Sequence, residues 1–114
     1  MLANRIFALS PSVRYVASYR NGKLETEQRG GLTGASGAES DKYEEIFVNP
    51  ILLKLVQQRG NLDCGGARFV VVRYGHFYQL VIALPDGHVS VCFELSSNPL
   101  EFSDDIERIT TSLP

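Results

Sequence analysis

Hydrophobic residues at the start of the chain follow a helical period and then change to the pattern of a strand. The residues at helical spacing are Leu2, Ile6, Phe7 and Leu9. They predict a short helix over residues 1–9 that stops at Ser10-Pro11. Residues 13–20, VRYVASYR, are rich in Val and Tyr and predict a strand.

Asn21-Gly22 follows this strand and predicts a two-residue hairpin turn, because a type I′ turn needs positive φ at both central residues. In that register Arg20 pairs with Lys23 and Ser18 pairs with Glu25. The returning run, KLETEQR, is polar, so we expect it at an edge of the sheet, where charge discourages unwanted pairing. The stretch RGGLTGASG comes next and lacks the Lys-Ser/Thr ending of a phosphate loop, so it is interpreted as a connector.

The middle of the chain carries two helical patterns in series. Ser40 can cap a first helix, and the acidic residues that follow it suit the positive end of a helix dipole. Asn49-Pro50 interrupts this pattern, so we expect a second helical piece to begin there, to run through ILLKLVQQR and to stop at Gly60. Its apolar residues occupy more than one narrow stripe of the helix surface. The sheet can bury only one side, so a further element must bury the rest, and a second subunit is a candidate.

Three strands then predict an antiparallel meander. They are residues 68–73 (RFVVVR), 76–84 (HFYQLVIAL) and 88–95 (HVSVCFEL). Residues 85–87, Pro-Asp-Gly, are typical of a turn, because Pro presets φ, Asp bonds locally and Gly takes the left-handed position. Interpreted as a three-residue loop, this turn pairs Leu84 with His88 and Leu80 with Cys92.

A last helix and the order of the strands complete the predicted fold. Helix start signals lie at residues 98–99 and 103–105, and the apolar face that follows is Phe102, Ile106, Ile109 and Leu113. We predict one α/β (α+β) domain over residues 1–114, in the order α-β-β-α-β-β-β-α, with a five-stranded antiparallel sheet. Strands 13–20 and 88–95 are expected to be central neighbours, and strand 68–73 to be an apolar edge that favours association.

Composition narrows the classes of function. The chain has 114 residues, of which 44% are hydrophobic, enough for one core. Its 11 basic and 13 acidic residues give a net charge of −2, which argues against nucleic-acid binding. No apolar run approaches the roughly 18 residues of a membrane span, and the N-terminus is too polar for a signal peptide, so we expect a cytoplasmic protein without membrane insertion.

The titratable residues do not form a recognisable catalytic or metal site. In the predicted register His76 lies about 26 Å from the turn that precedes His88, and Cys92 sits midway and joins neither histidine. Cys64 lies in a loop with no adjacent histidine, and both cysteines are expected to be reduced thiols. We therefore expect no catalytic residue, no metal and no cofactor, and interpret residues 73–95 as sheet strands.

Charged residues at the ends of elements have structural interpretations. The acid pairs Glu44-Glu45 and Asp104-Asp105 occupy first turns of predicted helices, where they suit the helix dipole and solvent. The arginines that flank strands are Arg14, Arg20, Arg68 and Arg73. We expect them to form ion pairs at the ends of the sheet, and the binding of an anion is the alternative.

The element order, together with VRYVASYRNGKL and RFVVVRYGHFYQLVIALPDGHVSV, resembles the roadblock (dynein light chain) family, which has a profilin-like fold. The resemblance covers nearly the whole chain and is greatest to the small stand-alone roadblock-like proteins of archaea. It implies a homodimer in which the middle helix and the third strand pair across a two-fold axis. The matching positions are Ile51, Leu52, Leu55 and Val56 on the helix and Phe69, Val70, Val71 and Val72 on the strand. Asn49-Pro50 departs from the more continuous helix that is usual in the family.

The main hypothesis is therefore a non-enzymatic homodimeric scaffold or regulatory module. Since family members often act as platforms for small Ras-like GTPases, such a GTPase is a candidate partner besides a second copy of the chain. An alternative is a small-molecule sensor of the PAS or longin kind, which a pocket of a few hundred cubic ångströms would favour. Its motivation is the aromatic set Tyr15, Tyr19, Tyr74, Phe77 and Tyr78. A third hypothesis is an enzyme that uses Cys64.

Overall fold

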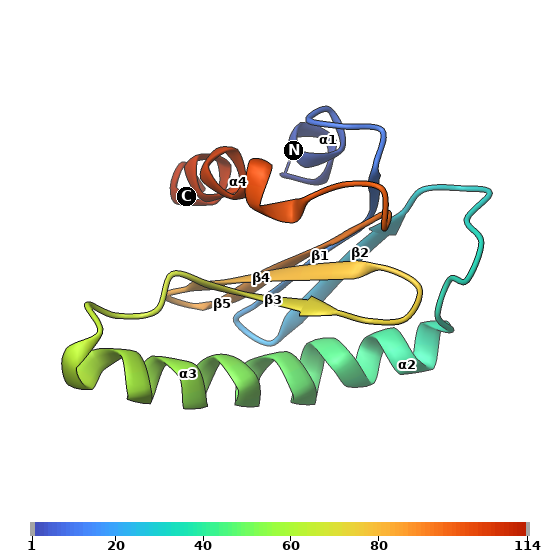
Figure 1. Cartoon of the computed structure of the whole chain (residues 1–114). Helices are drawn as coiled ribbons and strands as arrows, with labels where there is room; N and C mark the ends of the chain where they lie inside the picture. The colour runs from blue at the N-terminus through green and yellow to red at the C-terminus, as the bar shows by residue number, and fades with distance from the viewer. Residues whose placement is uncertain (1, 114) are drawn as a thin grey trace.

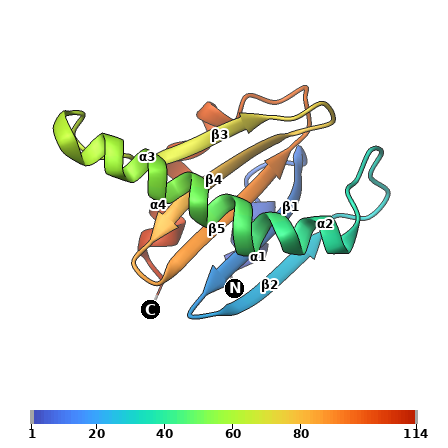
Figure 2. The ribbon, with the colours of Figure 1, turned by 90° about the horizontal axis from the view of Figure 1, so that it is seen from below.

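The computed structural model describes residues 2–113 and has three layers, with the sheet in the middle (Figure 1). The strands are β1 (Val13–Arg20), β2 (Lys23–Gln28), β3 (Phe69–Arg73), β4 (Tyr78–Leu84) and β5 (Gly87–Phe93). The helices are α1 (Leu2–Phe7), α2 (Ala38–Tyr43), α3 (Asn49–Asp63) and α4 (Ser103–Thr111), with a π-helical segment η1 (Glu44–Val48) and a 3₁₀ turn η2 (Pro99–Glu101). Helices α1 and α4 cover one face of the sheet, and α2, η1 and α3 cross the other face obliquely (Figures 1 and 2).

The sheet confirms the predicted fold class and strand arrangement. Its order is β2-β1-β5-β4-β3 and every neighbouring pair is antiparallel, so β1 and β5 are central and β3 is an edge. The first hairpin has the predicted register, with Arg20 opposite Lys23 and Ser18 opposite Glu25. Asn21 and Gly22 have φ angles of 52° and 78°, as the type I′ turn requires.

The predicted register of the second hairpin was wrong by one residue. Pro85 and Asp86 alone form the turn, and Leu84 pairs with Gly87 instead of His88. Gly87 belongs to β5 and also pairs with Arg20 of β1, where a Cβ would collide with the carbonyl oxygen of Tyr19. The glycine is therefore required by the close approach of a neighbouring strand. Consequently Leu80 pairs with Val91, and Cys92 pairs with Gln79.

The predicted break at Asn49-Pro50 does not occur. The helix is continuous from α2 through η1 into α3, because the hydrogen-bond ladder changes just before the proline. The N–H of Asn49 donates to the carbonyl of Glu44, five residues earlier, which is the π-helical bond. Pro50 has no N–H to donate, so it is tolerated in the first turn of α3.

Both predicted ends of the middle helix also differ from the structure. The residue that precedes α2 is Gly37, and Ser40 lies inside the helix without a capping role. At the other end α3 passes Gly60 and ends at Asp63. Gly60 is buried where the chain turns back toward β3, and a Cβ there would lie 2.9 Å from the backbone nitrogen of Ala67. Close packing therefore explains this glycine, which sequence reasoning had assigned to a helix end.

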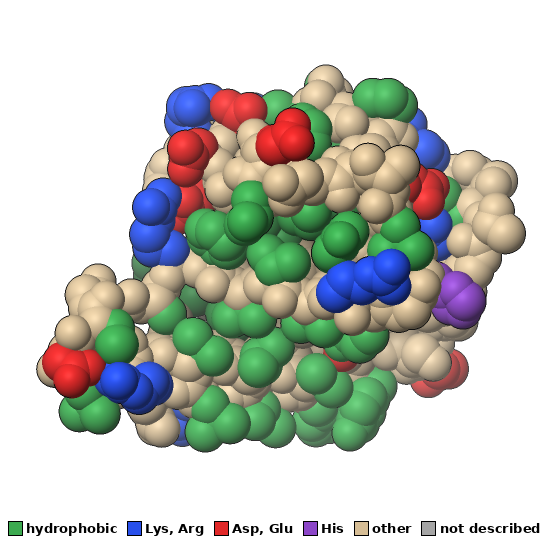
Figure 3. Space-filling model, in the orientation of Figure 1, with side chains coloured by type: hydrophobic (Ala, Val, Ile, Leu, Met, Phe, Trp, Pro, Cys, Tyr) green, Lys and Arg blue, Asp and Glu red, His purple; other side chains and the backbone are tan. Residues whose placement is uncertain are grey.

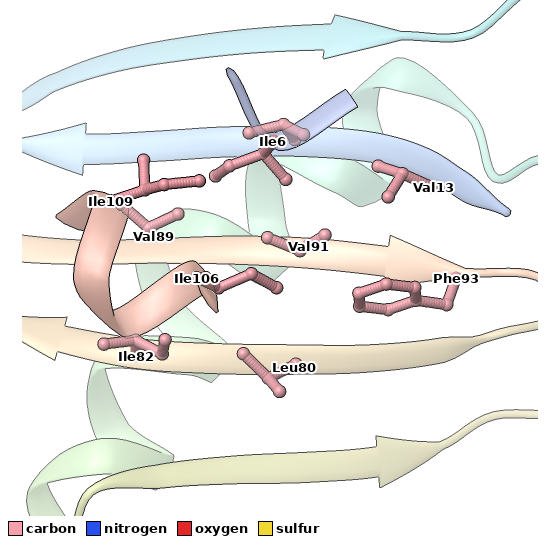
Figure 4. Close-up of a cluster of buried hydrophobic side chains, with 10 residues drawn as sticks. Ile6, Val13, Leu80, Ile82, Val89, Val91, Phe93, Ile106 and Ile109 are labelled. Carbon is pink, nitrogen blue, oxygen red and sulfur yellow. The ribbon is translucent and has the colours of Figure 1, made fainter. Parts of the chain in front are cut away.

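The main hydrophobic core lies between the sheet and the pair α1 and α4 (Figure 4). Its buried members are Ile6, Val13, Val16, Leu80, Ile82, Val89, Val91, Phe93, Ile106 and Ile109. The last helix was predicted correctly, since Ile106 and Ile109 are buried and Phe102 stacks on Phe93 with ring centroids 5.6 Å apart. Alternate residues of β5, which are Val89, Val91 and Phe93, all belong to this core.

Candidate functional site

The long helix on the other face of the sheet has its polar side inward and an apolar side outward. Glu45, Asn49 and Leu53 face the protein interior, with exposed fractions of 1%, 0% and 7%. A second set of positions, also four residues apart, is apolar and exposed. We call it the apolar stripe: Tyr43 (62% exposed), Phe47 (54%), Ile51 (59%) and Leu55 (61%). Around η1 this polarity is the reverse of an ordinary surface helix.

Glu45 is the centre of the buried polar contacts beneath this helix. Its Oε1 lies 2.8 Å from Nε2 of His88 and accepts a hydrogen bond of 3.0 Å from Nδ2 of Asn49. Its Oε2 accepts from the hydroxyls of Ser90, at 2.6 Å, and Tyr15, at 3.1 Å. Four donors match the four acceptor positions of a carboxylate, so the geometry fits an ionised Glu45 with a hydrogen on Nε2 of His88.

The same contacts continue along the helix toward the edge of β4. Gln79 and Asn49 exchange side-chain hydrogen bonds of 3.3 Å in both directions. Gln79 also donates to Oε1 of Glu44 at 3.0 Å, and the Tyr74 hydroxyl donates to the same oxygen at 2.5 Å. We call the buried set the polar layer: Tyr15, Glu45, Asn49, Gln79, His88 and Ser90. Within residues 2–113 no buried side-chain nitrogen or oxygen lacks a hydrogen-bond partner.

The local electrostatics keep the donors of this region protonated. Burial, followed by the negative charge of Glu45, raises the pKa of Tyr15. Burial and the hydrogen bond to Glu44 raise the pKa of Tyr74. Burial, then Glu45, raises the pKa of the Cys92 thiol. These groups therefore act as neutral donors or apolar surface, and Cys92 is a poor candidate for a nucleophile.

A pocket of about 340 Å³ opens beside the polar layer, between α2 and η1, the sheet, and the loop from β3 to β4. Its helical side carries the carboxylates of Asp41, Glu44 and Glu45, and its sheet side carries Tyr15 and Cys92. We call it the acidic pocket; it is lined by Tyr15, Ser36, Ser40, Asp41, Glu44, Glu45, Tyr74, Gly75, His76, Phe77, Gln79 and Cys92. Its volume lies within the range of small-molecule sites.

The residues predicted for a dimer interface occupy two neighbouring parts of the surface. Ile51 and Leu55 lie in the apolar stripe, and Leu52 and Val56 beside them are half-buried. The predicted strand residues, Phe69, Val70, Val71 and Val72, all lie in β3, which has no partner on its outer side. Phe69 and Val71 also pack against the main core. Figure 3 shows hydrophobic side chains gathered over α3 and the β3 edge.

The histidines and cysteines are placed in part as predicted. His88 lies in β5, opposite Ala83 of β4, near the turn of the hairpin. His76 precedes β4 at the other end of the hairpin, so the two histidines remain apart. The structural interpretation of His88 was incomplete, because it bonds Glu45, 43 residues away. Cys92 and His76 line the same pocket, which the sequence did not indicate. Cys64 is exposed, and its thiol donates to the neighbouring Asp63 carboxylate.

The predictions for the acid pairs and the arginines were correct for some residues and wrong for others. Asp104 and Asp105 lie in the first turn of α4, as predicted. Glu44 and Glu45 do not lie in a solvated first turn, because Glu44 accepts a hydrogen bond from Gln79 of β4 and Glu45 accepts one from Ser90 of β5. Three predicted arginine pairs are present: Arg14–Glu94, Arg20–Asp86 and Arg68–Glu107. Arg73 instead donates to the carbonyl oxygen of Tyr74.

No group of three or more His, Cys, Asp or Glu side chains in residues 2–113 is arranged to hold a metal ion. None of the helices in the same range combines the length and the apolar character that crossing a bilayer requires.

Sequence reasoning missed the polar layer, although two patterns indicate it. His88 and Ser90 put polar side chains on one face of a central strand, whose other face is apolar. Glu45 and Asn49 lie four residues apart and therefore share one side of a helix. A polar face on a central strand requires a polar partner above it, and the crossing helix supplies that partner.

Among solved structures, the chain is similar in fold to MglC from Myxococcus xanthus. The TM-score is 0.50 with 10% sequence identity, over 90% of this chain and 88% of the MglC chain. No protein-family model matches the chain, and no curated protein is significantly similar to it in sequence. At this identity the likeness concerns the fold alone, and it supports the roadblock-like arrangement predicted from the sequence.

Proposed function

We propose that the chain is a non-catalytic scaffold that works as a homodimer. The observation that carries this proposal is the apolar stripe on the outer side of the long helix, next to the unpaired apolar edge strand β3. Four large apolar side chains, each more than half exposed, form a hydrophobic patch, and such patches mark interaction sites. The apolar edge strand β3 is a second surface of a kind that natural proteins rarely leave uncovered.

A second copy of the same chain fits both surfaces at once. Two β3 strands that pair antiparallel about a two-fold axis would extend the sheet across both subunits. The same axis would place the two long helices side by side, because α3 crosses the sheet near this edge (Figure 2). Such an interface is self-complementary, as a two-fold dimer requires.

The regulatory partner in this proposal is a small Ras-like GTPase, and the location is the cytoplasm. Support comes from the resemblance to the roadblock family, whose members often act as platforms for such GTPases, and from the fold similarity to MglC. Affinity purification from the native host, followed by mass spectrometry, tests the partner. Recovery of the dimer without any GTPase would restrict the function to a scaffold for other proteins.

Light scattering tests the dimer. The wild-type chain is expected at twice the 12.6 kDa mass of one copy. Leu55→Lys puts a charge into the apolar stripe and is expected to give a monomer with an unchanged fold, since Leu55 is 61% exposed. Leu100→Lys is the matched control, because Leu100 is 58% exposed but lies on η2, away from the stripe.

The β3 edge has its own measurement. Hydrogen exchange of the β3 amides is expected to slow as the protein concentration rises through the dimerisation range, and Leu55→Lys should abolish this dependence. A wild-type protein that stays monomeric at about 50 µM would contradict the proposal. So would a Leu55→Lys variant that keeps the wild-type mass.

A second candidate function is the small-molecule sensor of the PAS or longin kind. The acidic pocket favours it, because its volume of about 340 Å³ meets the size that the sequence analysis set for such a site.

A further inference from the structure

The acidic pocket has an apolar floor and an aromatic wall. Tyr15 and Cys92 project from the two central strands and pack with Phe77 in a small cluster separate from the main core. Phe77 is also 5.6 Å from Tyr74, ring centroid to ring centroid, and both line the pocket. These surfaces offer contact to the apolar body of a ligand, and aromatic faces also attract a cation.

The helical side of the pocket supplies negative charge that the described residues leave without a cationic partner. Asp41 and Glu44 both line the pocket, and in residues 2–113 neither forms an ion pair with Lys or Arg. Arg14 lies close by, 5.3 Å from the Phe77 ring centroid, but its guanidinium bonds Glu94 and the carbonyl of Thr33. The pocket therefore presents carboxylates that no Lys or Arg of residues 2–113 neutralises, with His76 as the basic side chain of its lining.

The Cys92 thiol lies at the apolar floor of the pocket. It is 6% exposed, lines the pocket and makes no hydrogen bond to another described residue. Burial raises the pKa of this thiol, and so does the negative charge of Glu45, Asp41 and Glu44, in that order. Burial likewise raises the pKa of Asp41. Besides burial, the negative charge of Glu45 contributes to both shifts, and this charge gives the pocket a negative potential in which a positive ligand is favoured.

We infer that the acidic pocket binds a small organic ammonium ion. The ammonium group lies against the carboxylates of Asp41 and Glu44, and the apolar part lies against Tyr15, Phe77 and Cys92. This inference deepens the second candidate function and does not depend on the dimer, since the pocket lies on the inner side of the helix and the apolar stripe on its outer side.

A matched series of three benzyl compounds tests the charge that the pocket selects. Benzylamine, benzyl alcohol and phenylacetate carry a positive, a neutral and a negative group on the same apolar body. In two-dimensional ¹H–¹⁵N NMR titrations, benzylamine is expected to bind with a Kd on the order of 1 mM, as suits so small a ligand. Benzyl alcohol is expected to bind about tenfold more weakly, and phenylacetate to cause no shifts.

Two variants and a control locate the site. Asp41→Asn and Glu44→Gln keep the shape of the pocket, and each is expected to weaken benzylamine binding about fivefold to tenfold. Glu39→Gln is the control, because Glu39 is an exposed acid of the same helix that does not line the pocket. The Glu39→Gln variant is expected to bind benzylamine as the wild type does. Cys92→Phe is expected to abolish binding, because the larger side chain fills the floor of the pocket, and its NMR spectrum shows whether the variant is folded.

Several outcomes would overturn the inference. One is benzyl alcohol binding as tightly as benzylamine, which would leave an apolar pocket without charge selection. Another is unchanged benzylamine affinity in the double variant of Asp41 and Glu44. A third is the absence of pocket shifts with every probe at about 20 mM, a concentration that would reveal even weak binding. The light-scattering result for the dimer is measured separately and is unaffected by any of them.

Discussion

The two faces of the sheet are covered in opposite ways. On the side of α1 and α4 the contact is made of aliphatic and aromatic side chains packed in the ordinary manner (Figure 4). On the side of the long helix, the contact around η1 is made of hydrogen bonds, with Glu45 at its centre. The first face stabilises by removing apolar area from water. The second fixes where the helix lies, because each donor has one matching acceptor.

This difference explains why the apolar residues of the long helix lie outside. Since polar side chains of three strands occupy the inner side, the apolar residues of η1 and early α3 are left facing away from the sheet. Because the polar layer occupies the inner side of the helix, the apolar stripe is exposed on the outer side, where a second copy is proposed to bury it. The comparison predicts that the two faces respond differently to substitution.

The largest effect is expected on the apolar face. Phe93→Ala removes a fully buried ring that stacks on Phe102, and it is expected to lower the free energy of unfolding by about 3–5 kcal/mol. Urea denaturation measures the loss. Phe47→Ala is the matched control, with a small cost that depends on protein concentration, because Phe47 is buried only in the proposed dimer. Equal costs for both variants at low concentration would contradict the assignment of the core.

A smaller effect is expected in the polar layer. Glu45→Gln keeps the shape of the side chain but places an amide donor against donors, so it is expected to cost about 1–3 kcal/mol. The same denaturation experiment measures it, with the exposed Glu39→Gln as control. If Glu45→Gln were as stable as the wild type, the carboxylate would not organise this face.

The smallest effect, with the opposite sign, is expected at the mouth of the pocket. Because burial raises the pKa of Asp41, the folded protein binds a proton there more readily than the unfolded chain. Folding with Asp41 ionised is therefore penalised, and Asp41→Asn is expected to raise the melting temperature slightly at pH 7. The gain should shrink as the pH falls through the pKa of Asp41. A melting-temperature difference that stays constant or grows on acidification would contradict this.

Local signals predicted much of the fold. The register of β1 and β2 follows from Asn21-Gly22, because two positive φ angles permit one tight turn. The alternation of β5 likewise determines which face enters the core. The order of the strands followed from the antiparallel connections and the polar character of β2.

Features set by residues distant in the sequence were not predicted. Gly87 resembles a turn glycine, but its role depends on Tyr19 in another strand. The link between Glu45 and His88 spans 43 residues, and neither residue alone indicates it. Asn49-Pro50 resembles a helix break because proline has no N–H to donate. The helix continues nevertheless, since the backbone hydrogen bonds just before the proline are π-helical. The acidic pocket is lined by residues of the helix, the sheet and two loops, so only its aromatic content was visible in the sequence.

The π-helical segment has a consequence for length variation in this part of the chain. It contains the extra residue of a wide turn, so a deletion within Glu44–Val48 could restore an ordinary α-helix without breaking the chain path. Because the wide turn takes up its extra residue locally, such a deletion would leave α3 in phase with α2, and Asn49 would keep its place opposite Gln79. A one-residue deletion in the α-helical parts on either side would instead rotate everything after it by about 100°. Single-residue deletions should therefore be tolerated in the glycine-rich connector and in the π-helical turn, and rejected in α2 and α3.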